Sequence, residues 1–162
     1  MGSAHELSGF SCGVKPLDIW LREHAFENQR RDLSRTYVLV DDANNVIGYY
    51  ALTMGGVRKE ALPTRYGRGL PDFDIGMVLL ARLAVDEAHK GQGLGRDLLI
   101  EALGRAADAG SQVAAKFVAV DPIDESARAF YQRFGFRDVV GDPEGRMYIR
   151  IDEALAALGE AE

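Results

Sequence analysis

The strongest chemical signal in the sequence is a glycine-rich turn between an apolar run and an amphipathic segment. The apolar run covers residues 77–85, and the turn reads Lys90-Gly91-Gln92-Gly93-Leu94-Gly95-Arg96. Glycines allow tight torsions, so successive N–H groups can surround an anion at a helix N-terminus, where the macrodipole adds positive charge. The spacing fits neither the Walker A loop nor the dinucleotide fingerprint. The pattern favours a pyrophosphate site, with a purely structural turn as the alternative.

An aromatic segment supplies a second candidate for chemistry. Phe130, Tyr131, Phe134 and Phe136 follow one another at close spacing. Aromatic residues at helical spacing usually belong to a core, and we expect this of the three phenylalanines. A tyrosine hydroxyl has a reference pKa of about 10, so Tyr131 stays protonated at neutral pH and can act as a general acid.

No strong base is evident. None of His5, His24 and His89 has a carboxylate partner at motif spacing; we expect His24 in the core and His89 in the turn. Asp72 and Asp74 remain possible bases. Without a base, an α-amine of pKa about 7.8 is roughly 30% neutral near pH 7.4, whereas a lysine is only about 0.1% neutral. The absence of a base therefore favours an α-amine as acceptor.

Charge is unevenly distributed along the chain. The 162 residues contain 19 Lys and Arg against 25 Asp and Glu, a net charge of −6, which argues against a general nucleic-acid binder. The first 70 residues are different, with nine basic and eight acidic side chains. A solvated surface is one explanation, and a local basic face is the other. The candidate cations are Arg22, Arg30, Arg31, Arg35, Arg58, Lys59, Arg65 and Arg68.

Composition indicates one globular domain over residues 1–162, with 47% hydrophobic and 27% charged residues. The single Cys12 excludes an intramolecular disulfide and the multi-cysteine zinc patterns, and we expect no metal. No apolar run reaches the roughly 18 residues of a membrane span, and no signal region is evident at the N-terminus. We therefore expect a cytoplasmic protein.

Hydrophobic periodicity predicts the elements that position these residues. A helix over 15–29 should bury one face that includes Leu17 and Leu21, and helices should follow the glycine turn and Asp124. Gly110 is expected as a C-cap, Asp124 as an N-cap and Gly135 as a stop signal. An irregular stretch covers 55–75, and an Ala/Leu-rich helix should end the chain.

Five runs have the composition of strands. The first two are joined by a five-residue turn and predict a hairpin, and the third is apolar enough to be buried on both faces. A hairpin followed by strand–helix–strand units predicts a mixed α/β sheet. The runs are 37–40, 46–53, 77–85, 117–120 and 147–151.

The glycine turn resembles the (Arg/Gln)-x-x-Gly-x-Gly loop of the GCN5-related N-acetyltransferases (GNAT), with Lys90 in the first position. The resemblance implies the GNAT acyl-CoA N-acyltransferase fold, with a splayed central strand, and acetyl-CoA as acetyl donor. It further implies that backbone groups of Leu83, Ala84 and Val85 bind the pantetheine arm. The residues expected at the pyrophosphate are Lys90, Gly91, Gln92, Gly93, Leu94 and Gly95, with Arg96 in reach of a coenzyme phosphate.

The aromatic segment resembles the family's Asn-x-x-Ala-x-x-Phe-Tyr-x-x-x-Gly-Phe motif, with Asp124 in place of the asparagine. In this family a tyrosine at the position of Tyr131 directs its hydroxyl at the thioester sulfur. The resemblance thus assigns the general acid to Tyr131. The N–H of Val85 is a candidate donor to the thioester oxygen.

Several further segments resemble, in order, the GNAT toxins of type II toxin–antitoxin systems. Among them are His5 to Gly13, Leu17-x-x-Trp20-Leu21, Gly69-Leu70-Pro71 and the run Leu79 to Asp86. These toxins acetylate the α-amino group of the amino acid on charged elongator tRNA and so block translation. A ribbon-helix-helix antitoxin, which binds operator DNA, neutralises them, and a homodimer is expected.

This resemblance makes the eight cations candidates for binding the tRNA acceptor stem. Two alternatives remain open at this point. One is an N-acetyltransferase acting on a protein N-terminus or a small amine, and the other is a non-catalytic acyl-CoA-binding module.

Overall fold

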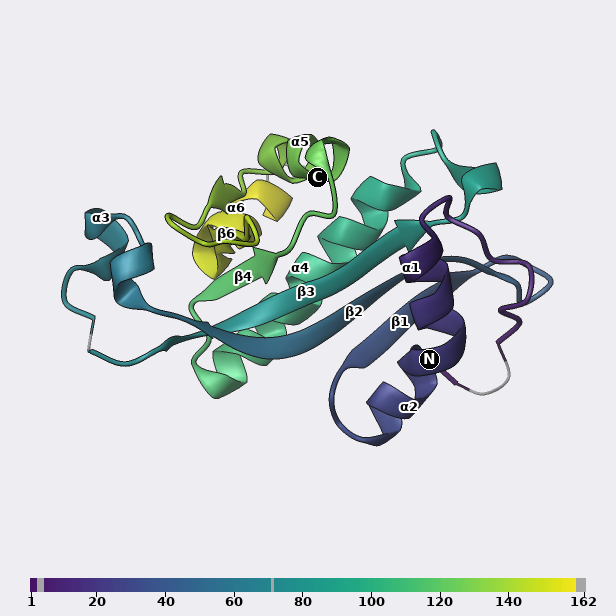
Figure 1. Cartoon of the computed structure of the whole chain (residues 1–162), viewed down its shortest axis with the longest axis horizontal. Coiled ribbons are helices and arrows are strands. Elements are labelled where there is room, and N and C mark those ends of the chain that lie inside the picture. Colours follow the sequence, from purple (N-terminus) through teal and green to yellow (C-terminus); the bar gives the residue numbers. More distant parts are fainter. Residues whose placement is uncertain (3–4, 71, 160–162) are drawn as a thin grey trace. The chain divides into compact units, whose positions relative to one another are not determined.

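The computed structural model describes residues 1–2, 5–70 and 72–159. Within them, six strands form one mixed sheet in the order β1-β2-β3-β4-β6-β5 (Figure 1). This sheet confirms the expected mixed α/β fold class. Pro71, from the segment Gly69-Leu70-Pro71, lies outside the described residues. The strands are β1 (Arg35–Val40), β2 (Val46–Val57), β3 (Ile75–Val85), β4 (Phe117–Val120), β5 (Arg137–Asp138) and β6 (Met147–Arg150).

The chain divides into two compact units. The first comprises residues 1–53 and 80–102, and the second comprises residues 54–79 and those from 103 onward. Strands β2 and β3 and the long helix α4 (Leu94–Val113) each contribute residues to both units. Each unit is described by itself.

The N-terminal helix of the first unit is interrupted by a π-helical turn. It consists of α1 (Lys15–Ile19), the π-helix η1 (Trp20–His24) and α2 (Ala25–Arg30), and the amide of Ala25 bonds to the carbonyl of Trp20. The sequence predicts one regular helix here. The wider turn keeps Leu17, Leu21 and Ala25 buried but exposes His24, so the expectation of a core histidine is wrong.

The predicted hairpin is confirmed. Strands β1 and β2 pair antiparallel from Arg35↔Leu52 to Val40↔Val46, with one irregularity near the end of β1. In the connection, the Asp41 carboxylate accepts hydrogen bonds from the amides of Ala43 and Asn45, both at 2.9 Å. A carboxylate that accepts from its own backbone is a common way to close such a turn. Strand β2 continues four residues beyond the predicted end.

The first unit's core joins the N-terminal helix to the hairpin. Tyr49 on β2 is fully buried, and its hydroxyl donates to the carbonyl of Leu17 at 2.9 Å. Phe10 meets the Tyr49 ring edge-on at 5.6 Å, and Ala84 of β3 belongs to the same cluster. This cluster fixes the N-terminal segment beside the end of β3.

In the second unit, Gly110 is not the predicted C-cap. Helix α4 continues to Val113, and Ala114 adopts a positive φ of 59° just beyond it. A Cβ on Gly110 would lie 2.6 Å from Cδ1 of Ile151, the first residue of α6 (Ile151–Gly159). Glycine at this position therefore allows the Ile151 side chain to pack closely against the helix, and it does not reverse the chain.

The predictions around Asp124 are confirmed. Its carboxylate accepts the amide of Ala127 at 2.7 Å and caps helix α5 (Glu125–Arg133). Gly135 follows at φ 88°, as a helix stop requires. The sequence does not predict the two-residue strand β5, whose Arg137 pairs with Tyr148 on β6.

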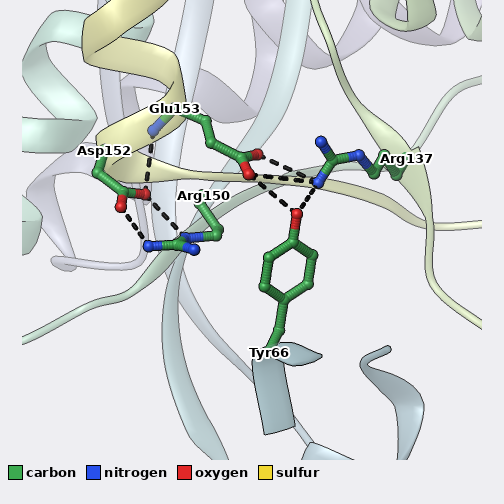
Figure 2. A network of polar contacts seen from close by, with 5 residues as sticks. All are labelled: Tyr66, Arg137, Arg150, Asp152 and Glu153. Carbon is green, nitrogen blue, oxygen red and sulfur yellow. Dashed lines mark hydrogen bonds and ion pairs between the residues drawn. The ribbon is translucent and has the colours of Figure 1, made fainter. Parts of the chain in front are cut away.

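The stretch predicted as irregular contains two short helical turns, η2 (Lys59–Ala61) and α3 (Thr64–Gly67). Tyr66 anchors the second turn: it is buried, and its hydroxyl donates to Glu153 at 2.9 Å and accepts from Arg137 (Figure 2). The guanidinium of Arg150, which is paired with an aspartate, lies 5.3 Å from the Tyr66 ring. The loop is thus tied to α6 and to two strands of its own unit.

No helix in the described part of the chain has both the length and the apolar composition of a membrane span.

Replacing Leu21 tests the packing that the π-helical turn produces. Leu21 is fully buried, so Leu21→Ala should lower the free energy of unfolding by about 2–5 kcal/mol through lost burial and a cavity. Leu33→Ala is the control, because Leu33 is 51% exposed and should change stability by less than about 0.5 kcal/mol. Denaturant unfolding measures both, and equal losses would contradict this packing.

Candidate active site

The glycine-rich turn lies in the first unit and connects β3 to α4 through the short 3-10 turn η3 (Glu87–His89). Gly91 and Gly93 have φ of 77° and 83°, which side chains with a Cβ rarely adopt, and no heavy atom lies within 4 Å of a Cβ built at either position. Glycine is therefore required here for its torsions and not for lack of space.

Six consecutive amides in this turn have no hydrogen-bond partner in the part of the chain that the structure describes. No residue in the described ranges accepts from the N–H groups of residues 91–96, and the first bond of the following helix is donated by Asp97 to the carbonyl of Gly93 at 3.1 Å. Unpaired amides at a helix N-terminus attract anions, and the helix dipole adds to the attraction. The turn therefore has the geometry of a phosphate site.

Asp86 holds the start of this turn. Its amide donates to the carbonyl of Ile47 at 2.9 Å, and its carboxylate accepts the amides of Ser11 and Ala88, both at 3.0 Å. Partial burial would raise the pKa of Asp86, but the hydrogen bonds from Ser11 and His89 outweigh it and keep that pKa below its usual value. The residue therefore stays an anion and an acceptor near neutral pH.

His89 does have a carboxylate partner, contrary to the sequence prediction. Its Nδ1 lies 3.3 Å from Oδ1 of Asp86, three residues earlier. The Asp-x-x-His spacing was visible in the sequence, and it becomes a contact because η3 turns the two side chains together. The expectation that His89 belongs to the turn is confirmed.

The N-terminal segment is bonded to the same turn. Lys90 Nζ donates to the carbonyl of Cys12 at 2.6 Å, and the amide of Glu87 donates to the carbonyl of Ser11 at 2.8 Å. The buried carboxylate of Asp18 accepts the Cys12 amide at 2.9 Å. The ammonium of Lys90 is thus engaged with the backbone of its own unit, while its place among the pyrophosphate ligands stays a prediction.

The other predicted coenzyme residues of the first unit lie on either side of the turn. Leu83 is half-buried at the end of β3, and Ala84 and Val85 are buried. Arg96 is exposed in the first turn of α4, with its guanidinium 3.8 Å from the Asp97 carboxylate. Their contacts with a coenzyme stay predictions.

Tyr131 lies on α5 in the second unit. Its ring centroid is 5.3 Å from that of Phe130 and 5.4 Å from that of Phe136. Phe136 is a core residue as expected, whereas Phe130 and Phe134 are half-buried. Burial raises the pKa of Tyr131, and no described residue hydrogen-bonds its hydroxyl. The proton is therefore retained at neutral pH, as a general acid requires.

Asp72, one of the two candidate bases, offers little basicity. Both Asp72 and Asp74 are exposed, and a hydrogen bond and ion pair from Lys59 lower the pKa of Asp72. Among the described residues, no three His, Cys, Asp or Glu side chains gather as metal ligands would.

The eight candidate cations divide equally between the two units. In the first, Arg22 bonds to the carbonyl of Phe10 at 3.0 Å, and Arg30 and Arg35 pair with acidic neighbours. In the second, Arg58 and Lys59 are paired with carboxylates, and Arg65 lies 4.6 Å from the Tyr66 ring. Arg31 and Arg68 are exposed and have no ion pair with a described residue.

A sequence model of the Acetyltransferase (GNAT) family matches residues 6–136. The chain belongs to this family. A tRNA-acetylating toxin of Mycobacterium tuberculosis (strain ATCC 25618 / H37Rv) is 36% identical over 160 residues, which cover 99% of this chain and 95% of the toxin. The GNAT fold expected from the turn and the aromatic motif is thereby confirmed.

Two solved structures of the toxin AtaT are similar to the whole fold. One is AtaT complexed with acetyl-methionyl-tRNAfMet, with a TM-score of 0.89, 28% identity, and coverage of 96% of this chain and 93% of AtaT. The other is a mutant AtaT bound to the C-terminus of the antitoxin AtaR and acetyl-CoA. Its TM-score is 0.80 at 27% identity, with coverage of 94% of this chain and 89% of that chain. GNAT relatives of this chain thus bind acetyl-CoA, an acetylated tRNA and an antitoxin.

Substituting Gly93 tests the phosphate-binding geometry of the turn. Gly93→Ala strains a positive φ and displaces the neighbouring amides, so the Kd for acetyl-CoA should rise roughly tenfold or more. Gly104→Ala, within α4 where nothing crowds a Cβ, should leave that Kd unchanged and stabilise the helix slightly. Calorimetric titration with acetyl-CoA measures both Kd values. Equal affinities for the two variants would contradict the role of the turn in binding the coenzyme.

Proposed function

We propose that this chain is the toxin of a type II toxin–antitoxin system that transfers an acetyl group from acetyl-CoA to the α-amino group of aminoacyl-tRNA. Residues 1–162 form one N-acetyltransferase domain in this proposal. The observation that carries it is the match to the tRNA-acetylating toxin of M. tuberculosis, which extends over nearly the full length of both proteins. The likeness to AtaT in complex with an acetylated tRNA supports the same substrate class.

The coenzyme is assigned to the glycine-rich turn and the strand before it. The unpaired amides of residues 91–96 would bind the pyrophosphate, and backbone groups of Leu83, Ala84 and Val85 would bind the pantetheine arm. Arg96 is exposed beside these amides and would pair with a coenzyme phosphate. Preformed donors of this kind bind an anion without the cost of rearranging the loop.

In the transfer step, the neutral amine attacks the thioester carbonyl, a C–N bond forms and the C–S bond breaks. Tyr131 donates its proton to the departing thiolate, and the amine's proton leaves to water. A donor such as the Val85 amide would stabilise the oxyanion that develops. Because an α-amine is substantially neutral near pH 7, proximity can drive this reaction without a dedicated base.

Tyr131→Phe removes only the proposed acid. Turnover on charged tRNA should fall roughly a hundredfold or more, while the free energy of unfolding changes little because the ring still packs. Tyr148→Phe is the matched control: Tyr148 is also buried in the second unit, its hydroxyl has no partner among the described residues, and its loss should not affect turnover. Single-turnover kinetics measure both, and a fully active Tyr131→Phe refutes the acid role.

The candidate cations are proposed to contact the tRNA acceptor stem. Arg31 and Arg68 are the two whose side chains have no ion pair, hydrogen bond or ring contact with a described residue. Reversing both, Arg31→Glu with Arg68→Glu, should weaken tRNA binding and reduce the log–log salt slope by roughly two, since two phosphate contacts are lost. The exposed pair Arg133→Glu with Lys116→Glu makes the same change in net charge elsewhere. If both doubly substituted proteins show the same salt slope, the assignment is wrong.

The choice of acceptor is tested by direct competition. The protein is incubated with acetyl-CoA and, in separate reactions, charged tRNA, free amino acids or peptides, and release of coenzyme A is followed. The proposal predicts release with charged tRNA far above the other two. Faster release with peptides or free amino acids indicates an N-acetyltransferase of another class, and coenzyme binding without release indicates a non-catalytic module.

A basic antitoxin with a ribbon-helix-helix domain is the proposed partner, through which the complex reaches operator DNA. The toxin AtaT, bound to the C-terminus of its antitoxin, supports this assignment. The excess of acidic residues after position 70 supplies charge complementarity to such a partner. A homodimer completes the proposal.

A further inference from the structure

Arg82 is a half-buried cation without a carboxylate partner among the residues that the structure describes. It lies on β3 in the first unit, directly before Leu83, Ala84 and Val85. Within the described residues, the Arg82 side chain forms one hydrogen bond, from Nη1 to the neighbouring carbonyl of Ala81 at 2.7 Å. Most of the five N–H donors of the Arg82 guanidinium are therefore available to another acceptor. Because the cation is partly desolvated, an anionic acceptor is favoured.

Aromatic rings hold this guanidinium in place. Arg82 lies over the indole of Trp20, with 5.1 Å from Cζ to the ring centroid. Trp20 in turn stacks on Tyr49 at 5.9 Å with an interplanar angle of 12°, and Tyr49 is fixed by its bond to the carbonyl of Leu17. The side chain is thus held by stacking, while its hydrogen-bond donors remain available.

The backbone beneath this stack is also unusual. Trp20 is the first residue of the π-helix η1, which interrupts an otherwise regular helix. Such π-turns are rare and occur often at functional sites. The π-turn, the stack and the unpaired guanidinium occur together in one unit, on the face of β3 that also carries Ala84.

We propose that Arg82, positioned by Trp20, binds a phosphate of the single-stranded 3′ end of the tRNA. This inference rests on the proposed function, because the acceptor amine is attached to that end. Arginine combined with aromatic side chains is typical of single-strand recognition, where cation–π contacts and phosphate pairing act together. Arg82 is a different residue from the eight cations assigned to the acceptor stem.

The test measures tRNA binding and therefore does not depend on turnover. Uncharged tRNA and the same tRNA without its single-stranded 3′ nucleotides are titrated against the wild-type protein and Arg82→Met. Removing the 3′ nucleotides should weaken wild-type binding roughly ten- to a hundredfold, as expected for a lost charged hydrogen bond. Arg82→Met should bind both RNAs with the same weakened affinity, and its salt slope for intact tRNA should fall by about 0.7.

Controls separate this role from others. Arg133→Met removes an exposed arginine that has no ion pair with a described residue, and this variant should keep the full effect of RNA truncation. Arg82→Lys keeps the positive charge but lacks the planar guanidinium, so RNA truncation should have an intermediate effect on its binding. This variant also provides a readout if Arg82→Met does not fold. The Kd for acetyl-CoA should be unchanged in both Arg82 variants.

Two results overturn the inference. If truncating the RNA weakens wild-type protein and Arg82→Met by the same factor, Arg82 does not contact the 3′ end. If the Kd for acetyl-CoA rises with the substitution, Arg82 belongs to the coenzyme site. Failure of the proposed function gives a different result. RNA truncation would still weaken wild-type binding more than binding by Arg82→Met, but charged tRNA would not be acetylated.

Discussion

The Asp86 carboxylate accepts the amides of Ser11 and Ala88, and through these bonds the N-terminal segment, β3 and the glycine-rich turn are held together. Lys90 adds a bond from the turn to the carbonyl of Cys12. These contacts fix the backbone that precedes the six amides of residues 91–96, which have no partner among the described residues. The candidate coenzyme site thus depends on a segment that lies some 75 residues away in the sequence.

Elements defined by local signals could be predicted from the sequence. The hairpin, the apolar strand and the Asp124 cap were all predicted, because each depends on residues that are near neighbours in the chain. The π-turn was not, since hydrophobic spacing assumes a regular helix, and His24 was consequently placed in the core. The C-cap prediction for Gly110 is wrong because the close approach of Gly110 to Ile151 is a tertiary contact, which local sequence does not reveal.

The candidate site shows the same division. The glycine spacing and Tyr131 are visible in the sequence because they belong to compact motifs of a known family. The bond from Ser11 to Asp86 and the stack of Arg82 on Trp20 join distant segments, and no spacing rule predicts them. The sequence predicts the basic residues as one face, yet most of their side chains have partners within their own unit. Of the eight, Arg31 and Arg68 are the two whose side chains have no ion pair, hydrogen bond or ring contact with a described residue.

Acetylation of the amino acid on charged tRNA is the central claim. Mass spectrometry of the aminoacyl-adenosine released by nuclease from total charged tRNA, after incubation with the protein and acetyl-CoA, tests it most directly. The account predicts that aminoacyl-adenosines gain the mass of one acetyl group on the α-nitrogen, and that the gain is strongly reduced with Tyr131→Phe. Charged tRNA that stays unmodified while the protein binds acetyl-CoA would contradict the account.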